Sequence, residues 1–363
     1  MSLKVRLKAV LKSIKIIIEN KSHTRYFTNE KIGLIKTKLN KSQLKQIKRF
    51  YKPYATKINP LFHTFYTEKR GEFDVRYIPD DLWFTKIDRH FNNREKARVL
   101  DHKSYYERMF IGQNVKHPET IIHRINGLWY DFEMNLISRE KAKEIVAKEK
   151  SLFVKVSTGS CGGRGVTHIS DKEDIVSQFE KCTNHKSDIV VQREIKQHPE
   201  LYKVGQNSVN SLRIVSLLTK EGVTVYSCIL RMGIGDSKVD NASSGGIICG
   251  IKENGALKDI AWTMYGETFE RHPTTNIRFS EIKIPSFDKV INTVKELHPM
   301  IPDFRLVSWD IVVDEKEEPV LLEVNLCLGG LDLHQLPNGP MFKEDTEQIL
   351  KEVFGEKKKG VNI

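Results

Sequence analysis

The most informative part of the sequence is a pair of hydrophobic stretches near its end, WDIVV at residues 309–313 and LLEVN at residues 321–325. A short, highly charged segment separates them, so we expect them to form the two strands of a hairpin. This arrangement places Asp310 beside Glu323 and Asn325, and the last two share one face because they are two residues apart on a strand. Hydrophobic neighbours on both sides imply a largely buried strand, where carboxylates need partners, so a hairpin with its polar residues in water is the weaker interpretation. Two carboxylates and an amide oxygen are ligands that suit Mg²⁺, and we therefore predict a metal site here.

The sequence upstream of this hairpin alternates between short predicted strands and helices. Hydrophobic runs at 211–219 and 222–231 flank a turn at 220–222 and predict a second hairpin. The Ile-Val-Val run within 188–193 predicts a strand that is buried on both faces. Antiparallel hairpins combined with helices indicate an α+β fold rather than a doubly wound sheet. The other predicted strands are 152–156 and 166–169, and the predicted helices are 138–147 with Ser138 as N-cap, 170–182 with a capping box from Ser170 to Glu173, 287–297 and 341–353.

The predicted strand 152–156 carries a candidate anion-binding feature. Lys155 supplies a positive charge, and the polar loop that follows, 157–165, contains four glycines within seven residues. Glycines let backbone N–H groups approach an anion closely. The loop does not match the P-loop pattern and no predicted helix begins at it, which disfavours a P-loop or dinucleotide-binding site. Taken alone, a glycine-rich loop is more often only a turn.

Two arginines stand on the predicted strands of the second hairpin. Arg213 lies near the start of the first strand and Arg231 at the end of the second. Inward-facing arginines can hold a transferring phosphoryl group or an acyl phosphate. Each arginine taken separately is more often a side chain on the surface of a sheet, and the Ser-Ser-Gly-Gly run at 243–246 can be a simple flexible loop.

The composition is that of an ordinary globular protein, with 363 residues of which 39% are hydrophobic and 29% charged. This length predicts two or three compact subdomains. No hydrophobic run reaches the roughly 20 residues that a membrane span needs, so we expect no transmembrane helix. Lysines and arginines interrupt the first eighteen residues, so we expect no signal peptide. The five cysteines are scattered without a CxxC pair, which predicts reduced thiols in a cytoplasmic protein rather than disulfides or a zinc site.

The net charge of +12 is carried by the N-terminal segment. Residues 1–57 contain sixteen lysines and arginines against two acids, whereas the remaining 306 residues contain 43 basic and 45 acidic side chains. Since the body of the protein has a net charge of −2 and no nucleic-acid-binding signature, we predict that it does not bind nucleic acid. Residues 1–18 have the period of a basic amphipathic helix, which suits an anionic membrane surface and equally suits packing on the protein's own body. A weaker helical pattern runs through residues 44–51.

Taken in order along the chain, these features resemble the ATP-grasp superfamily, and most closely its sugar-transfer-associated branch, which is met among polysaccharide-biosynthesis proteins. The resemblance covers about residues 75–363. It implies an ATP-grasp fold, in which two α+β lobes clasp ATP, preceded by a helical N-terminal region. The stretches that carry it are 77–81, 101–103, 153–155, 191–195, 210–215, 240–246, Asp310 and 323–325.

The resemblance also implies roles for individual residues. Lys103 matches the first phosphate-binding lysine, although His102 stands between it and the preceding aspartate. Lys155 matches the second lysine, and the glycine-rich loop matches the one that closes over the phosphates. The hinge that reads adenine usually begins with an acidic residue, where this chain has Gln192. The implied cofactor-binding residues are Lys103, Lys155, Gly159, Ser160, Gly162, Gly163, Gly165, Gln192, Arg193, Glu194 and Ile195. Arg213 and Arg231 match the catalytic arginines near the γ-phosphate, and Asp310, Glu323 and Asn325 match the metal ligands.

Two histidines near the predicted site are candidate phosphoryl acceptors, since a histidine can accept a phosphoryl group. His198 follows the hinge, where we expect a structural or ribose-contacting role, and His334 is a candidate for the lining of an acceptor pocket. Neither stands in a pattern with a base and an orienting group, so we do not favour a phosphohistidine.

The resemblance implies an enzyme that uses ATP and Mg²⁺ to join a small-molecule carboxylate to an amine through an acyl phosphate. Catalysis would rest on positioning and charge neutralisation, without a protein nucleophile. The branch suggests sugar-linked substrates in bacterial cell-surface polysaccharide biosynthesis, in the cytoplasm, with residues 1–18 as a candidate contact with the inner face of the membrane. The alternatives are a phosphotransferase, which would leave a stable phosphorylated product, and a non-catalytic tethering module, which would not need the metal ligands. We divide the chain into a basic N-terminal segment (1–57), a connecting helical region (58–95), an N-terminal lobe with Lys155 (96–190) and a C-terminal lobe with the metal ligands (191–363).

Overall fold

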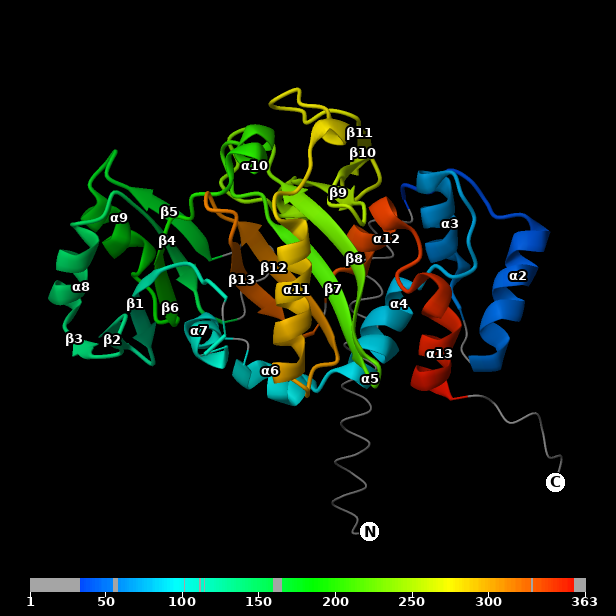
Figure 1. The fold of residues 1–363 in the computed structure, drawn as a ribbon, viewed down its shortest axis with the longest axis horizontal. Coiled ribbons are helices and arrows are strands. Elements are labelled where there is room, and N and C mark those ends of the chain that lie inside the picture. Colours follow the sequence, from blue (N-terminus) through cyan, green and yellow to red (C-terminus); the bar gives the residue numbers. More distant parts are fainter. Residues whose placement is uncertain are drawn as a thin grey trace, which may run out of the picture.

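Two antiparallel sheets and the helices packed on them form the body of the protein (Figure 1). The computed structural model describes residues 33–54, 58–100, 102–110, 112–113, 115–158, 165–327 and 329–355. The predicted α+β fold is confirmed. The predicted basic helix at 1–18 lies outside the described residues, and so do Gly159, Ser160, Gly162 and Gly163 of the glycine-rich loop.

The smaller sheet has six strands in the order β3-β2-β1-β6-β4-β5, and the helices α8 and α9 pack on it. The strand β6 lies inside the sheet, and its Ile189, Val190 and Val191 are fully buried, as predicted. Trp129 and Phe179 fill the core between sheet and helices. The elements are β1 Thr120–Ile125, β2 Leu128–Asp131, β3 Leu136–Ile137, α8 Arg139–Val146, β4 Ser151–Val156, β5 Val166–Ser170, α9 Ile175–Cys182 and β6 Ile189–Arg193.

The larger sheet has seven strands in the order β11-β10-β9-β8-β7-β12-β13, with helices on both faces. Leu230 of β8 packs in one hydrophobic cluster with Val290 of α11, whereas its neighbour Ile229 packs with Leu336 of α12. Because successive residues of a strand point to opposite faces, α11 and α12 cover opposite sides of the sheet. The elements are α10 Pro199–Val204, β7 Leu212–Thr219, β8 Gly222–Met232, β9 Ile247–Ile251, β10 Leu257–Trp262, β11 Thr268–Phe269, α11 Phe287–Leu297, β12 Leu306–Val313, β13 Pro319–Asn325 and α12 Leu331–Asn338.

Helices from the two ends of the chain pack together on the α12 side of the larger sheet. Tyr51 and Trp83 from the N-terminal part share a buried cluster with Leu350 from the C-terminal helix and with Val215 and Leu217 of β7. The start of α2 is fixed by a capping box between Asn40 and Gln43. The helices are α2 Lys41–Tyr51, α3 Pro60–Arg70, α4 Asp80–Leu82, a π-helical segment Trp83–Ile87, α5 Asp88–Phe91, α6 Arg94–Leu100, α7 Tyr106–Met109 and α13 Thr346–Phe354.

Most predicted elements are confirmed, and two helix starts are wrong. Ser138 caps α8 by accepting a hydrogen bond from the N–H of Lys141, as predicted. The predicted capping box of the next helix does not form, because Ser170 ends β5 and the side chain of Asp174 caps α9 instead. The last helix begins at Thr346 rather than at 341. The predicted lobe boundary at residues 190 and 191 falls inside β6 and stays a prediction.

Candidate functional site

A cavity of about 500 Å³ opens between the two sheets and collects most of the residues singled out from the sequence. Its walls come from β4, β5 and the segment after β6 on one side, and from β7, β8, β12, β13 and the start of α12 on the other. The predicted site residues that line it are Lys103, Lys155, Arg193, Ile195, Arg213, Arg231, Asp310, Glu323 and Asn325. Basic side chains outnumber acidic ones in this set, which gives the cavity a positive potential suited to an anion.

The three candidate metal ligands lie together on the β12–β13 hairpin. Asp310 is directly opposite Glu323 in the antiparallel register, and Asn325 is opposite Ser308. Cross-strand neighbours have their Cβ atoms roughly 5 Å apart, so the side chains of Asp310 and Glu323 are adjacent. The hairpin prediction is therefore confirmed, and the position of its three polar side chains follows from the register.

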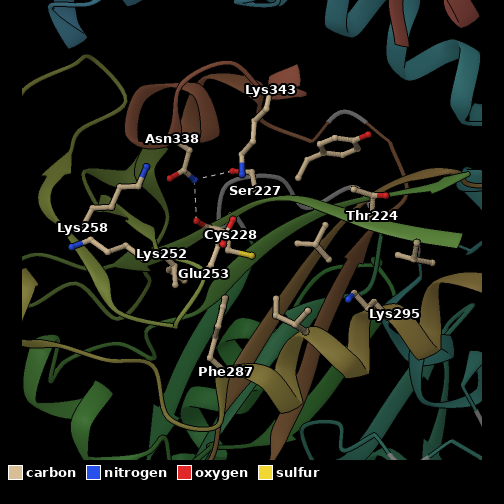
Figure 2. A pocket seen from close by; sticks show the side chains of 15 residues that line it. Thr224, Ser227, Cys228, Lys252, Glu253, Lys258, Phe287, Lys295, Asn338 and Lys343 are labelled. Atoms are coloured by element: carbon tan, nitrogen blue, oxygen red, sulfur yellow. Dashed lines mark hydrogen bonds between the residues drawn. The ribbon is translucent and has the colours of Figure 1, made fainter. Parts of the chain in front are cut away.

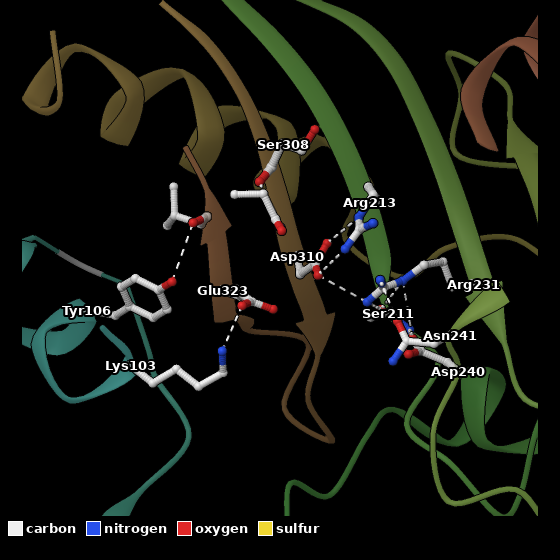
Figure 3. A network of polar contacts seen from close by, with 12 residues as sticks. Lys103, Tyr106, Ser211, Arg213, Arg231, Asp240, Asn241, Ser308, Asp310 and Glu323 are labelled. Carbon is white, nitrogen blue, oxygen red and sulfur yellow. Dashed lines mark hydrogen bonds and ion pairs between the residues drawn. The ribbon is translucent and has the colours of Figure 1, made fainter. Parts of the chain in front are cut away.

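Asp310 is bound by two arginines, one on the adjacent strand β7 and one on β8, the next strand beyond it (Figure 3). Arg213 on β7 donates from Nε to Oδ1 at 2.8 Å and from Nη2 to Oδ2 at 2.7 Å. Arg231 on β8 donates from Nη2 to Oδ2 at 3.1 Å. Burial alone would raise the pKa of Asp310, but the charges of the two arginines outweigh it and lower the pKa to about 2. The carboxylate therefore anchors both arginines at the wall of the cavity.

Arg231 is held by further groups that the sequence did not reveal as site residues. The hydroxyl of Ser211 accepts hydrogen bonds from its Nε at 3.0 Å and its Nη2 at 2.6 Å. Asp240 forms an ion pair with it at 3.6 Å and also accepts from the N–H of Ser211. The exposed fraction of the Arg231 side chain is only 6%, so this guanidinium is locked in place. The Asn210–Arg213 and Asp240–Gly246 stretches thus act partly as supports of one arginine.

Lys103 reaches across the cavity to Glu323. Its backbone N–H donates to the carbonyl of Ser157 at the end of β4, whereas its Nζ lies 2.8 Å from Glu323 Oε1 on β13 (Figure 3). Both side chains are largely buried. The backbone of Lys103 is therefore attached to the smaller sheet, whereas its charge is neutralised by Glu323 of the larger sheet.

Lys155 is the second lysine in the cavity and is held by Gln192. Its Nζ donates to Gln192 Oε1 at 2.8 Å, and Gln192 Nε2 donates to Thr120 Oγ1 at 3.1 Å. Burial and the nearby charge of Lys103 lower the pKa of Lys155 to about 8, although Glu323 partly offsets them. The amide of Gln192 is thus used to orient a lysine, and Gln192 is not among the residues that line the cavity.

The other residues of the predicted hinge and loop divide between the cavity and the surface. Ile195 lines the cavity with its hydrophobic side chain. Arg193 also borders it, but its guanidinium is paired with Glu149 at 2.6 Å and with Glu119. Glu194 is exposed and accepts a hydrogen bond from Ser151 at 2.6 Å. Gly165, the described end of the glycine-rich loop, has φ +75°, a conformation that favours glycine.

The two histidines considered from the sequence have structural roles. His198 caps α10 by accepting from the N–H of Glu200 at 3.2 Å, as the structural interpretation predicted. His334 does not line the cavity: its side chain is 1% exposed and its Nδ1 lies 2.8 Å from Ser227 Oγ. Burial and the charge of Arg213 lower the pKa of His334 to about 3, so it is neutral.

Sequence reasoning missed the hydrophobic and distal parts of the cavity wall. Phe153 and Val166 face it from the smaller sheet, as Leu322 does from β13. Asp332 and Leu333 at the start of α12 and Lys238 and Asn241 in the segment after β8 complete the wall. For Phe153, strand alternation was an available signal. Val154 is buried in the core of the smaller sheet, so its neighbour Phe153 points to the opposite face. The start of α12 carried no predicted element.

The chemistry of the donor set fits a divalent cation at Glu323 and Asn325. Glu323 uses Oε1 for Lys103, and Asn325 donates from Nδ2 to the carbonyl of Ser308 at 3.3 Å, which leaves one oxygen of each side chain to face a cation. Asp310 fits less well, because both of its oxygens already accept from arginines. Within the described ranges, no group of three or more His, Cys, Asp or Glu side chains could hold a metal.

Two further properties bear on the sequence predictions. The cysteines at 182, 228, 249 and 327 are free thiols. Among the helices of the described residues, none is both long and hydrophobic enough to span a membrane.

Comparison with known proteins places this site in context. The family model described as sugar-transfer associated ATP-grasp matches residues 84–351. No curated protein sequence matches the chain. One similar solved structure is an N5-carboxyaminoimidazole ribonucleotide synthetase in complex with ADP, at 11% identity and a TM-score of 0.42 over 72% of this chain and 54% of that chain.

Two other solved structures are similar to a comparable degree. The D-alanine–D-alanine ligase of Bacillus anthracis is 14% identical, with a TM-score of 0.42 over 72% of this chain and 68% of that chain. The biotin carboxylase domain of the 2-oxoglutarate carboxylase of Hydrogenobacter thermophilus is 14% identical, with a TM-score of 0.41 over 73% of this chain and 48% of that chain. The chain thus spans about half the length of the synthetase and of the carboxylase domain.

Proposed function

Because the chain belongs to the sugar-transfer associated ATP-grasp family, we propose that the cavity between its two sheets binds ATP and Mg²⁺ and that the protein is a ligase. The observation that carries this proposal is the set of four cations in the cavity, Lys103, Lys155, Arg213 and Arg231. They approach from both sheets, and two acidic side chains of the β12–β13 hairpin neutralise three of them. A polyphosphate can replace those acids as the partner of the cations.

In this proposal the lysines hold the phosphates of ATP. Lys155 and Lys103 contact the cavity from the smaller sheet, where the hydrophobic surface of Phe153 and Val166 suits the adenine ring. When the phosphates bind, Lys103 exchanges Glu323 for phosphate oxygens. Glu323 and Asn325 would hold Mg²⁺, which would neutralise charge on the phosphates. Asp310 keeps the two arginines in position, and it is therefore the weakest of the three candidate metal ligands.

The reaction that we propose joins a carboxylate to an amine in two steps. A carboxylate oxygen of the substrate attacks the γ-phosphorus, the bond from that phosphorus to the β,γ-bridging oxygen breaks, and ADP leaves. The amine nitrogen then attacks the carbonyl carbon, the bond from carbon to the phosphate oxygen breaks, and phosphate leaves as the nitrogen loses a proton. Arg213 and Arg231 hold the equatorial oxygens of the transferred group. No protein nucleophile is needed.

The substrate class that we propose comes from the family. Its description associates it with sugar transfer, so we propose that the carboxylate or the amine is carried by a sugar and that the product belongs to bacterial cell-surface polysaccharide. Lys238, Asn241 and Asp332 lie in the cavity wall and supply polar groups for such an acceptor. We propose that the reaction takes place on the cytoplasmic side of the membrane, with residues 1–18 as the contact to anionic lipid.

The first test is the melting temperature with Mg²⁺ alone and with ATP–Mg²⁺. A ligand that binds only the folded protein raises the melting temperature by mass action. We expect ATP–Mg²⁺ to raise it in the wild type and not in Glu323→Ala. Glu315→Ala is the matched control, because Glu315 is exposed in the turn of the same hairpin. No rise at saturating ATP–Mg²⁺ in a folded protein would refute the ATP site and favour a tethering role.

The second test identifies the reaction. Uronic acids and amines are added with ATP–Mg²⁺, and ADP, phosphate and new amides are measured by mass spectrometry. Release of ADP and phosphate that depends on both substrates, with an amide product, is the expected result. A stable phosphorylated product that forms without an amine would show a phosphotransferase instead.

A further inference from the structure

A second cavity, of about 540 Å³, lies away from the first, at the edge of β8 (Figure 2). The strand β9 pairs with β8 only between Ile229 and Met232, so residues 223–228 have β7 as their single strand neighbour in the described part of the chain. The gap beside them is walled by the β9–β10 turn, by α11, by the end of α12 and by Lys343. No residue of this wall belongs to the first cavity.

The second cavity is strongly basic. Four lysines line it, Lys252, Lys258, Lys295 and Lys343, against a single acid, Glu253. Lys252 lies 3.9 Å from the exposed Asp259, a weak surface pair. The structure gives no ion-pair partner to Lys295 or Lys343 among the described residues. A concave site with this excess of cations attracts an anion more strongly than a flat surface does.

Lys258 is the most confined of the four lysines. Its Nζ donates to the carbonyl of Pro337 at the end of α12, at 2.9 Å, which leaves two of its three donors for other partners. Burial, Arg70 and Lys343 lower the pKa of Lys258 to about 8, because three positive charges share one region. An anion placed between Lys258 and Lys343 would relieve this repulsion.

The remaining wall is suited to the organic part of a ligand. Ser227 and Thr224 supply hydroxyls, Asn338 supplies an amide and Phe287 of α11 supplies an aromatic ring (Figure 2). Ile291 of α11 adds to the hydrophobic part of the wall. The volume lies in the range of sites for small organic molecules and exceeds what an inorganic anion fills. Lysine holds phosphate as a compact point charge, whereas planar carboxylate recognition favours arginine.

From these features we infer that the second cavity binds a small organic phosphate, separately from the ATP site. The phosphate lies between Lys258 and Lys343, with Lys295 and Lys252 at the rim. The organic part extends over Phe287 and Ile291, and its hydroxyls meet Ser227 and Thr224. This inference does not depend on the proposed ligase activity, since no residue of the first cavity takes part.

The test measures the binding of glucose 1-phosphate to the full chain by titration calorimetry, without Mg²⁺ or ATP. Inorganic phosphate and glucose are separate arms. The double variant Lys295→Gln/Lys343→Gln removes two exposed lysines and spares the hydrogen bond that Lys258 makes to α12. Lys172→Gln is the matched control, because Lys172 is an exposed lysine outside both cavities. Lys155→Met disables the first cavity.

We expect glucose 1-phosphate to bind more tightly than inorganic phosphate, and glucose not to bind. The double variant should bind at least about tenfold more weakly, since it loses the charged hydrogen bond of Lys343 and the rim charge of Lys295. Lys172→Gln and Lys155→Met should bind as the wild type does, and the double variant should keep its stabilisation by ATP–Mg²⁺. Absence of binding, binding unchanged in the double variant, or binding lost in Lys155→Met would overturn the inference. Equal binding of inorganic phosphate would overturn the assignment to an organic phosphate.

Discussion

The ammonium of Lys103 lies 2.8 Å from the carboxylate of Glu323 and joins the two sheets across the cavity. Lys103 is attached to the smaller sheet through Ser157, and Glu323 belongs to β13 of the larger one. The same two side chains are the proposed partners of phosphate and of Mg²⁺. In the structure Lys103 occupies one of the two carboxylate oxygens of Glu323, so in the proposed function the binding of phosphate by Lys103 would release that oxygen for the cation.

Replacing Lys103 by methionine should therefore change two affinities in opposite directions. Without its partner, Glu323 is free to bind a cation, so the affinity for Mg²⁺ alone should rise by about tenfold, in line with the loss of one charge-assisted contact. The affinity for ATP–Mg²⁺ should fall by at least as much, because a phosphate contact is lost. Titration calorimetry measures both. Lys116→Met is the control: Lys116 forms a comparable ion pair with Asp314 at 2.7 Å outside the cavity, and its loss should change neither affinity. A parallel fall of both affinities would contradict this role of Lys103.

Asp310 should be important for stability as well as for function. Its side chain is 3% exposed and is the shared partner of Arg213 and Arg231. Asp310→Asn keeps the shape but leaves two buried guanidinium groups without their counter-ion, and breaking such a pair typically costs about 3–5 kcal/mol of unfolding free energy. Urea denaturation measures this loss. Asp303→Asn breaks an exposed pair with Lys96 and should cost at most about 1 kcal/mol. Equal losses in the two variants would show that Asp310 is not a buried anchor.

The hairpins could be predicted from the sequence because their information is local. The alternation and turn at 211–231 and the two stretches around Asp310 and Glu323 specify strand pairs whose partners are close in the chain. The order of the seven strands could not be predicted in this way, since β7 pairs with β12 across almost a hundred residues. The helix α12 was missed because its sequence contains Pro337 and follows two glycines, which are signals for a turn.

The sequence predicted many of the residues that line the cavity, but not the contacts that these residues make with one another. The family resemblance implied that Asp310, Arg213 and Arg231 belong to one site, but not that one carboxylate would hold both arginines. Ser211 and Asp240 stood out in the sequence only as parts of longer stretches. Their hydrogen bond and ion pair with Arg231 depend on the pairing of distant strands. Partners of this kind depend on tertiary structure, which local sequence patterns do not specify.

The affinity for ATP should fall as the pH rises through about 8. Lys155 has a lowered pKa of about 8 in the free protein, and only its protonated form attracts phosphate. Above that pH, binding has to take up a proton, so the affinity should decrease by up to tenfold per pH unit. Calorimetry between pH 7 and 9.5 measures the slope. Lys155→Arg should abolish the pH dependence, because arginine stays charged. Lys258→Arg should keep it, since Lys258 also has a pKa near 8 but lies outside this cavity. A flat wild-type profile would rule out a titrating phosphate contact at Lys155.

Burial and Lys103 lower this pKa, and the neutral hydrogen-bond partner Gln192 is the position at which we expect a substitution to raise it again. It accepts a hydrogen bond from Lys155 at 2.8 Å without adding negative charge. Gln192→Glu places a carboxylate beside the ammonium and should raise the pKa of Lys155 by at least one unit. The variant should bind ATP more weakly than the wild type at pH 7, because the new carboxylate competes with phosphate for the lysine. It should also lose less affinity between pH 7 and 9.

Two measurements separate this effect from a change in folding. Gln348→Glu adds the same charge to the exposed face of α13 and should leave both the affinity and its pH dependence unchanged. Gln192→Leu removes the hydrogen bond without adding charge, so Lys155 should lose its orientation while its pKa stays at or below about 8. The ATP affinities of the wild type and Gln192→Leu should then differ by a constant factor across the pH range. The ATP affinity of Gln192→Glu should approach that of the wild type as the pH rises. If Gln192→Glu and the wild type show parallel profiles, a carboxylate at position 192 does not change the charge of Lys155.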